Sequence, residues 1–134
     1  MGAAASLLTR MMEQVQNGVK TAFPATVLSY DIGKCEAKIQ PLFQTKEFNE
    51  SPVTPHVLED IPVLKHRFQA APDETELWGD TMRYRPVLKS GDVVWCQIAH
   101  RSLDGMAGGS PYYPGSARIM NTQDCVIVGV VKYA

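Results

Sequence analysis

The chain lacks a long apolar run and an excess of either charge. No segment approaches the roughly 20 apolar residues of a membrane-spanning helix, and the apolar start is broken at Thr9 and Arg10. That early break predicts that there is no signal peptide. The formal net charge is −1 over 134 residues, which argues against a general attraction to nucleic acid or anionic lipid. We therefore expect one folded domain that is synthesised in a cytoplasm and is not stably inserted in a membrane.

Cysteine is also scarce. Cys35, Cys96 and Cys125 form no Cys-x-x-Cys pair and lie in apolar, strand-like segments. An odd number without that spacing is typical of buried free thiols in a reducing compartment.

Residue patterns for catalysis or metal binding are missing as well. His56, His66 and His100 stand in no His-x-His or His-Glu-x-x-His context, so we expect no metal and no cofactor. Ser102 and Asp104 follow His100, but residues this close in sequence rarely form a catalytic triad, and no nucleophile elbow is present. The glycines after Asp104 are not followed by the Lys-Ser/Thr of a phosphate-binding loop. The sequence therefore predicts a protein that is not an enzyme.

One segment, residues 6–22, predicts a helix. Apolar residues three or four apart form a stripe along it: Leu7, Leu8, Met11, Met12, Val15 and Val19. Ser6 is a candidate N-cap, and Pro24 ends the helix because it disfavours a helical Phe23. The stripe can cover the chain's own β-domain or pack on another chain. Membrane insertion is disfavoured because the polar side of the helix carries few cations.

The remaining chain predicts strands. Alternating residues indicate a hairpin of residues 25–32 and 34–43 around a turn at 31–34. Further strands are expected at residues 61–65, 82–88, 93–99 and 125–131, with the second and third of these forming a hairpin around a turn at 89–92. Pro86 makes the strand before that turn short or peripheral. The last two strands are apolar on both alternating faces, which predicts protein on both sides.

Three segments predict loops, residues 44–55, 69–81 and 101–121, and the last of these is too rich in Gly, Pro and Ser to be core. One helix followed by five or six antiparallel strands favours a small closed antiparallel barrel, and the OB-fold fits best. We expect residues 1–22 to form the N-terminal amphipathic helix and residues 23–134 to form the OB-fold β-barrel domain.

Two short clusters combine cations with aromatic residues, at residues 65–68 (Lys-His-Arg-Phe) and 83–85 (Arg-Tyr-Arg). OB-folds that bind single-stranded nucleic acid use such combinations. Four carboxylates nearby dilute the positive field: Asp73, Glu74, Glu76 and Asp80. Nucleic-acid binding is therefore an alternative that we disfavour, compared with solvated strand ends or charge pairing with a partner protein.

The order of several short motifs resembles a known family. After the helix come FPATVLSYD at 23–31, CEAKIQPL at 35–42, IPVL at 61–64, RPVLKSGD at 85–92, HRSLDG at 100–105 and DCVIVG at 124–129. Over nearly the whole chain this resembles the N-terminal domain of the membrane-piercing central spike proteins of contractile bacteriophage tails. The resemblance implies a non-enzymatic virion protein of the baseplate, an OB-fold that trimerises on the tail axis beneath the hub, and a role in penetrating the host envelope. Family members usually continue into a β-helix with a sharp tip. Here the expectation includes the base or plug of the spike, with the point supplied by a separate spike-tip protein.

Two apolar surfaces are predicted to be interfaces, because a small barrel cannot hide both. One is the helix stripe. The other is one face of the last strand, formed by Cys125, Ile127, Gly129 and Val131, while Val126, Val128 and Val130 are expected to fill the barrel. This surplus of apolar surface predicts a homotrimer.

Overall fold

The structure is a computed structural model that describes residues 2–18, 21–46, 48–72, 77–115 and 118–134. Within these residues the elements are α1 (Ala3–Gly18), β1 (Ala22–Asp31), β2 (Glu36–Pro41), β3 (Leu58–Pro62), β4 (His66–Gln69), β5 (Thr81–Tyr84), β6 (Val93–Ile98), the 3-10 turn η1 (Thr122–Asp124) and β7 (Cys125–Lys132). The prediction of a mainly β chain with one N-terminal helix is confirmed.

The helix begins earlier and ends earlier than predicted. It covers Ala3–Gly18, so Ser6 lies inside it and is not its N-cap. Ala22 already belongs to β1, where it pairs with Gln97 of β6. Val19 of the predicted stripe lies outside the described residues.

Five strands form one antiparallel sheet in the order β3-β2-β1-β6-β7. The predicted closed barrel is wrong, because this sheet is open. Its edge strands meet where Val63, just after β3, forms an isolated parallel bridge with Ile127 of β7. The backbone N–H of Leu64 also donates to the carbonyl oxygen of Ile127 over 3.1 Å. This isolated bridge brings the edge strands β3 and β7 together without the continuous row of hydrogen bonds that joins paired strands.

The first predicted hairpin is confirmed. β1 and β2 are antiparallel, with Asp31 paired to Glu36. The Asp31 carboxylate accepts hydrogen bonds from the backbone N–H groups of Gly33 (3.0 Å) and Lys34 (3.3 Å), which fixes the turn. The hydrophobic core lies on one side of the sheet and includes Val27, Ile39, Ile61, Val94 and Ile127, all fully buried.

The second predicted hairpin is wrong. β6 pairs with β1 and β7, whereas β5 pairs with β4. The turn at residues 89–92 has the predicted form, with the Asp92 N–H donating to the Lys89 carbonyl over 3.0 Å. It lies against β1, because the Gly91 N–H donates to the Val27 carbonyl and the Val27 N–H donates to the Asp92 carbonyl. Gly91 has φ = 95°, a conformation that favours glycine.

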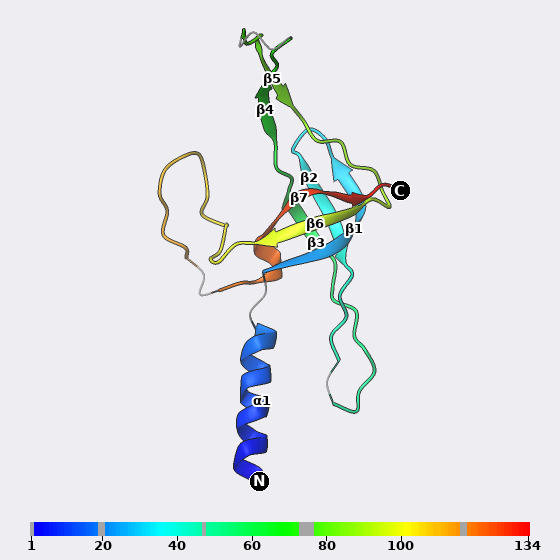
Figure 1. Ribbon diagram of the computed structural model, residues 1–134, viewed down its shortest axis with the longest axis vertical. Helices are drawn as coiled ribbons and strands as arrows, with labels where there is room; N and C mark the ends of the chain where they lie inside the picture. The colour runs from blue at the N-terminus through cyan, green and yellow to red at the C-terminus, as the bar shows by residue number, and fades with distance from the viewer. Residues whose placement is uncertain (1, 19–20, 47, 73–76, 116–117) are drawn as a thin grey trace.

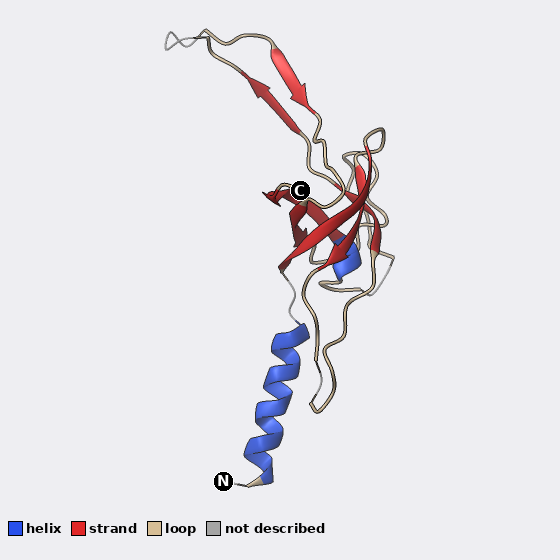
Figure 2. Ribbon diagram, turned by 90° about the vertical axis from the view of Figure 1, so that its right-hand side faces the viewer, coloured by secondary structure: helices blue, strands red, loops and turns tan. Residues whose placement is uncertain are grey.

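Helix α1 and the β4–β5 ribbon lie outside the sheet. Helix α1 extends from one end, and the β4–β5 ribbon extends from the opposite end (Figures 1 and 2). We call residues 65–85 the arm. The two named strands of the arm are four residues each, and β5 ends at Tyr84, as expected for a strand shortened before Pro86. The predicted loop at residues 69–81 connects them, so it belongs to the arm.

Candidate interaction surfaces

The apolar stripe of α1 is free of its own domain. Its five described members are 53–69% exposed: Leu7, Leu8, Met11, Met12 and Val15. No strand packs against the helix in the described part of the chain. A hollow beside the helix is lined by polar residues of its other side and by Phe48 of the β2–β3 loop. The stripe therefore does not cover the chain's own sheet, which rules out the first of the two predicted positions.

The face predicted for β7 is wrong for Cys125 and Ile127. Both side chains are fully buried in the core of a single chain, so they cannot present an interface. Gly129 and Val131 of the same predicted set are exposed. The cause is a β-bulge: Trp95 pairs with Gly129 but Cys96 pairs with Ile127, which leaves Val128 unpaired. Before the bulge the residues of β7 that face the core have odd numbers, Cys125 and Ile127. After the bulge the even-numbered Val130 packs on the core instead.

The outer face of β6 and β7 is apolar and uncovered. Trp95 is 44% exposed, so the prediction of protein on both sides of β6 does not hold within one chain. Val128 and Val131 are exposed beside it. Gly129 lies directly opposite Trp95, and a side-chain carbon added at Gly129 would meet open space. This outer face joins the helix stripe as apolar surface that a single chain leaves in water.

The arm brings together the two basic-aromatic clusters. Its register pairs His66 with Tyr84 and Arg67 with Arg83. Since side chains alternate across a strand, the ribbon has a basic face and an aromatic face. The basic face carries Lys65, Arg67, Arg83 and Arg85, and the aromatic face carries His66, Phe68, Met82 and Tyr84, all of them exposed. The ring of Phe68 contacts His66 (centroids 5.5 Å apart) and Tyr84 (5.7 Å).

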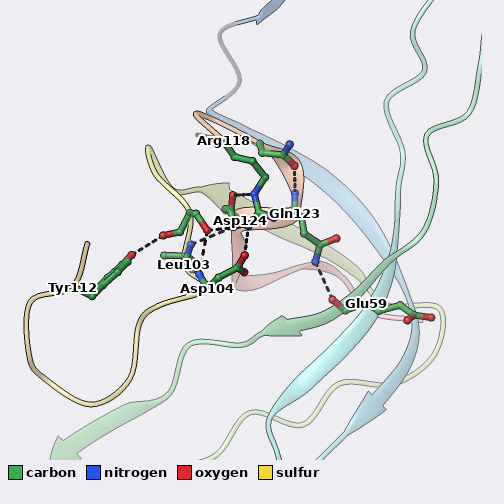
Figure 3. Close-up of polar contacts among 9 residues, drawn as sticks. Glu59, Leu103, Asp104, Tyr112, Arg118, Gln123 and Asp124 are labelled. Atoms are coloured by element: carbon green, nitrogen blue, oxygen red, sulfur yellow. Dashed lines mark hydrogen bonds and ion pairs between the residues drawn. The ribbon is translucent and has the colours of Figure 1, made fainter. Parts of the chain in front are cut away.

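The Ser102–Asp104 cluster is a brace for the long β6–β7 loop (Figure 3). Arg118 donates two hydrogen bonds to the buried carboxylate of Asp124, at 2.7 and 3.0 Å. It also donates to the Ser102 hydroxyl (3.0 Å) and the Asp104 carboxylate (2.9 Å). The hydrogen bond with Asp124 raises the pKa of Arg118 further. Ser102 is buried, so the prediction that this loop contributes nothing to the interior is wrong at that residue.

Sequence reasoning missed Arg118. The available signal was an arginine near the end of a Gly- and Pro-rich loop, six residues before an aspartate that precedes a buried strand. The Tyr112 hydroxyl adds a hydrogen bond to the Ser102 carbonyl (2.8 Å), and the Leu103 N–H donates to Asp124 (3.2 Å). With both Ser102 and Asp104 held in these contacts, the arrangement fixes a loop and presents no activated nucleophile.

Asp92 forms a second structural contact. Its carboxylate accepts the backbone N–H groups of Lys89 (2.8 Å) and Ala134 (2.9 Å), and these hydrogen bonds lower the pKa of Asp92. The contact ties the residues after β7 to the turn that precedes β6.

The three cysteines are buried and free, as predicted. A hydrogen bond to Cys125 and burial raise the pKa of the Cys96 thiol, which keeps it protonated. Among the described residues no group of His, Cys, Asp and Glu could hold a metal ion. In the described part of the chain, no helix combines the length and the apolar character that crossing a bilayer requires.

Comparison with known proteins gives one family. A comparison with curated proteins finds no match. The model of the family described as phage protein Gp138 N-terminal domain matches residues 23–129. The match begins at the second residue of β1 and ends within β7, so it takes in the sheet, the arm and the braced loop. The chain belongs to the phage protein Gp138 N-terminal domain family.

Proposed function

We propose that the chain is a structural virion protein that forms the trimeric central spike of a contractile phage tail, or the base of that spike. It then sits in the baseplate beneath the tail hub and serves penetration of the host envelope. Family membership over residues 23–129 supports a phage structural role. The motif order that resembles central spike proteins supports the finer assignment.

The observation that carries the proposal is the unpartnered stripe of α1. An isolated helix of 16 residues is marginal in water, and most helical stability comes from packing of the apolar side. Here that side is exposed and its own sheet does not cover it. Packing of the stripe on copies of the chain, or on the hub, removes this apolar surface from water.

We further propose that the sheet is an OB-fold. Two features support this proposal. The strand order is β3-β2-β1-β6-β7, and the parallel bridge between Val63 and Ile127 brings β7 beside the end of β3. Assembly around a tail axis would then use the outer side of this sheet, including the outer face of β6 and β7. The proposed role is that of a scaffold and not of an enzyme.

Nucleic-acid binding is the less favoured function. Binding of single strands uses a surface on which bases stack on aromatic rings while cations follow the backbone. On the arm, Arg67 and Arg83 lie on one face of the ribbon, whereas Phe68 and Tyr84 lie on the other. The two requirements are therefore separated.

The test is the mass of the purified chain in solution. Native mass spectrometry is expected to give three times the chain mass of 14.8 kDa. The variant Leu8→Asp/Met11→Asp places two charges in the stripe and is expected to weaken assembly. The control variant Ser6→Asp/Thr9→Asp places the same charges on the polar side of α1 and is expected to keep the trimer. A wild-type protein that remains monomeric across micromolar concentrations would contradict the proposal.

A further inference from the structure

We propose that the basic face of the arm docks on an acidic groove in the sheet of a second copy of this chain. The inference rests on the proposed homotrimer and adds the contact that joins neighbouring subunits. Each copy would give its arm to one neighbour and accept the arm of the other. A head-to-tail contact of this kind closes into a ring when the rotation between copies permits.

The direction of the arm is fixed at its base. On the β4 side, the Val63 N–H donates to the Cys35 carbonyl over 3.0 Å, and Leu64 bonds to β7. On the β5 side, the Tyr30 hydroxyl donates to the Pro86 carbonyl, and Leu88 is buried in the core. The arm is therefore anchored to the sheet at both ends and presents its faces in a defined direction.

The basic face of the arm is electrostatically unfavourable by itself. Arg67 lies directly opposite Arg83, and like charges at paired positions of two strands repel each other. Lys65 lines the same hollow as both arginines. None of these cations forms a salt bridge with a carboxylate among the described residues. An isolated two-stranded ribbon is only marginally stable in water, so an anionic partner would stabilise the arm.

The same chain carries a groove with the complementary charge. The groove is on β1, β2 and β3, and its ionisable residues are Asp31, Glu36, Glu59 and Asp60 with Lys34 and Lys38. A bulge in β3 turns the adjacent side chains of Glu59 and Asp60 to the same exposed side. The salt bridge from Lys38 to Glu59 is long, at 3.6 Å, and both side chains are exposed, which leaves carboxylates available for a partner.

The geometry favours a neighbour as the owner of the groove. The arm leaves the sheet and extends away from it in both views, so it does not fold back on its own groove (Figures 1 and 2). The four cations on the ribbon would meet a groove in which four carboxylates outnumber two lysines. A ribbon seated by its basic face also leaves Phe68 and Tyr84 on the side that faces away from the groove.

The test exchanges the charges of the two surfaces in the full-length chain. The variant Arg67→Glu/Arg83→Glu reverses the arm, and Glu36→Lys/Glu59→Lys reverses the groove. We expect each to raise the concentration for half-assembly ~10-fold or more, since close charge pairs contribute that much to association. The combined fourfold variant restores opposite charges and should recover trimer formation. Lys46→Glu/Arg101→Glu changes the net charge as the arm variant does, but on exposed residues that line neither surface, and should assemble normally.

The outcomes separate this contact from the trimer itself. If the arm variant assembles as the wild type does, the docking proposal is overturned and the trimer stands. If both reversed variants fail to assemble and the fourfold variant is not rescued, the arm does not meet this groove. If the arm variant loses only binding to a single-stranded oligonucleotide or to anionic vesicles, the basic face serves that polyanion instead. A monomeric wild type overturns both proposals. Circular dichroism of each variant establishes that the fold is retained.

Discussion

The sheet and the two projections that leave it use their apolar residues in opposite ways. Ile39, Val94 and Ile127 of the sheet are fully buried, and buried apolar residues like these stabilise a single chain. In α1 and the arm, apolar residues of similar size stand in water, as Leu7 at 60% and Phe68 at 55% exposure show. The difference indicates that the sheet holds the fold together, whereas the projections are available for association.

The largest expected effect lies at the β7 bulge, where a buried and an exposed residue are adjacent. Ile127→Asp places a carboxylate in the core without a partner and is expected to destabilise the chain by about 5 kcal/mol, a large part of the stability of a small domain. Val128→Asp changes an exposed position and should cost about 1 kcal/mol or less.

Urea unfolding of the two variants measures this difference. Two equal midpoints would show that Ile127 and Val128 do not lie on the inner and the outer face of the sheet as described.

A smaller effect is expected at the base of the arm. Burial raises the pKa of Tyr30 to about 12, from an ordinary value near 10, so folding favours the neutral phenol. The stabilisation is therefore fully present below about pH 10 and is lost as the pH rises toward 12. Tyr30→Phe should cost about 1 kcal/mol at neutral pH, because it removes the hydrogen bond to Pro86.

Thermal unfolding of wild type and Tyr30→Phe between neutral pH and pH 11 checks this dependence, and the gap between them should narrow as the pH rises. An absorbance titration should show one of the five tyrosines ionising late in the wild type. A gap that widens at high pH would mean that the neutral phenol is not the form favoured by folding.

The smallest expected effect on the sheet comes from removing α1. A chain without residues 1–20 keeps all of β1, and its unfolding free energy should stay within about 0.5 kcal/mol, because the helix stripe does not pack on the sheet. Assembly should be weakened in the same protein. Urea unfolding and native mass spectrometry of the truncated chain report the two properties separately. A truncated chain that fails to fold would place the helix in the core.

The features that could be predicted from the sequence are those that depend on residues close together in the chain. The turn at Asp31 and Gly33 and the alternation in β2 are local patterns, and the structure has both. The partners of β6 are not local: Met82 and Trp95 are close in sequence, yet β5 pairs with β4 while β6 pairs with β1. Local propensity cannot distinguish between these pairings.

The interface residues show the same limit. Strict alternation put Ile127 and Gly129 on the same face, but the unpaired residue at Val128 separates them, so Ile127 is buried and Gly129 is exposed. A bulge depends on the register with the partner strand, which a pattern in one strand does not contain. The stripe at Leu7 and Met11 was predictable as a stripe, but its exposure depends on where the helix leaves the sheet.

The brace formed by Arg118 has a consequence for the length that the β6–β7 loop can have. Because Arg118 holds Ser102, Asp104 and Asp124 together, the chain leaves the sheet and returns to it at the same contact, and the Tyr112 hydroxyl adds a second contact at the Ser102 carbonyl. Doubling the length of a flexible loop costs only about 0.6 kcal/mol in closure entropy. Insertions between Asp104 and Arg118 can therefore change the length and the exterior of the loop while β6 and β7 keep their register. A new peptide can be introduced there without redesigning the fold.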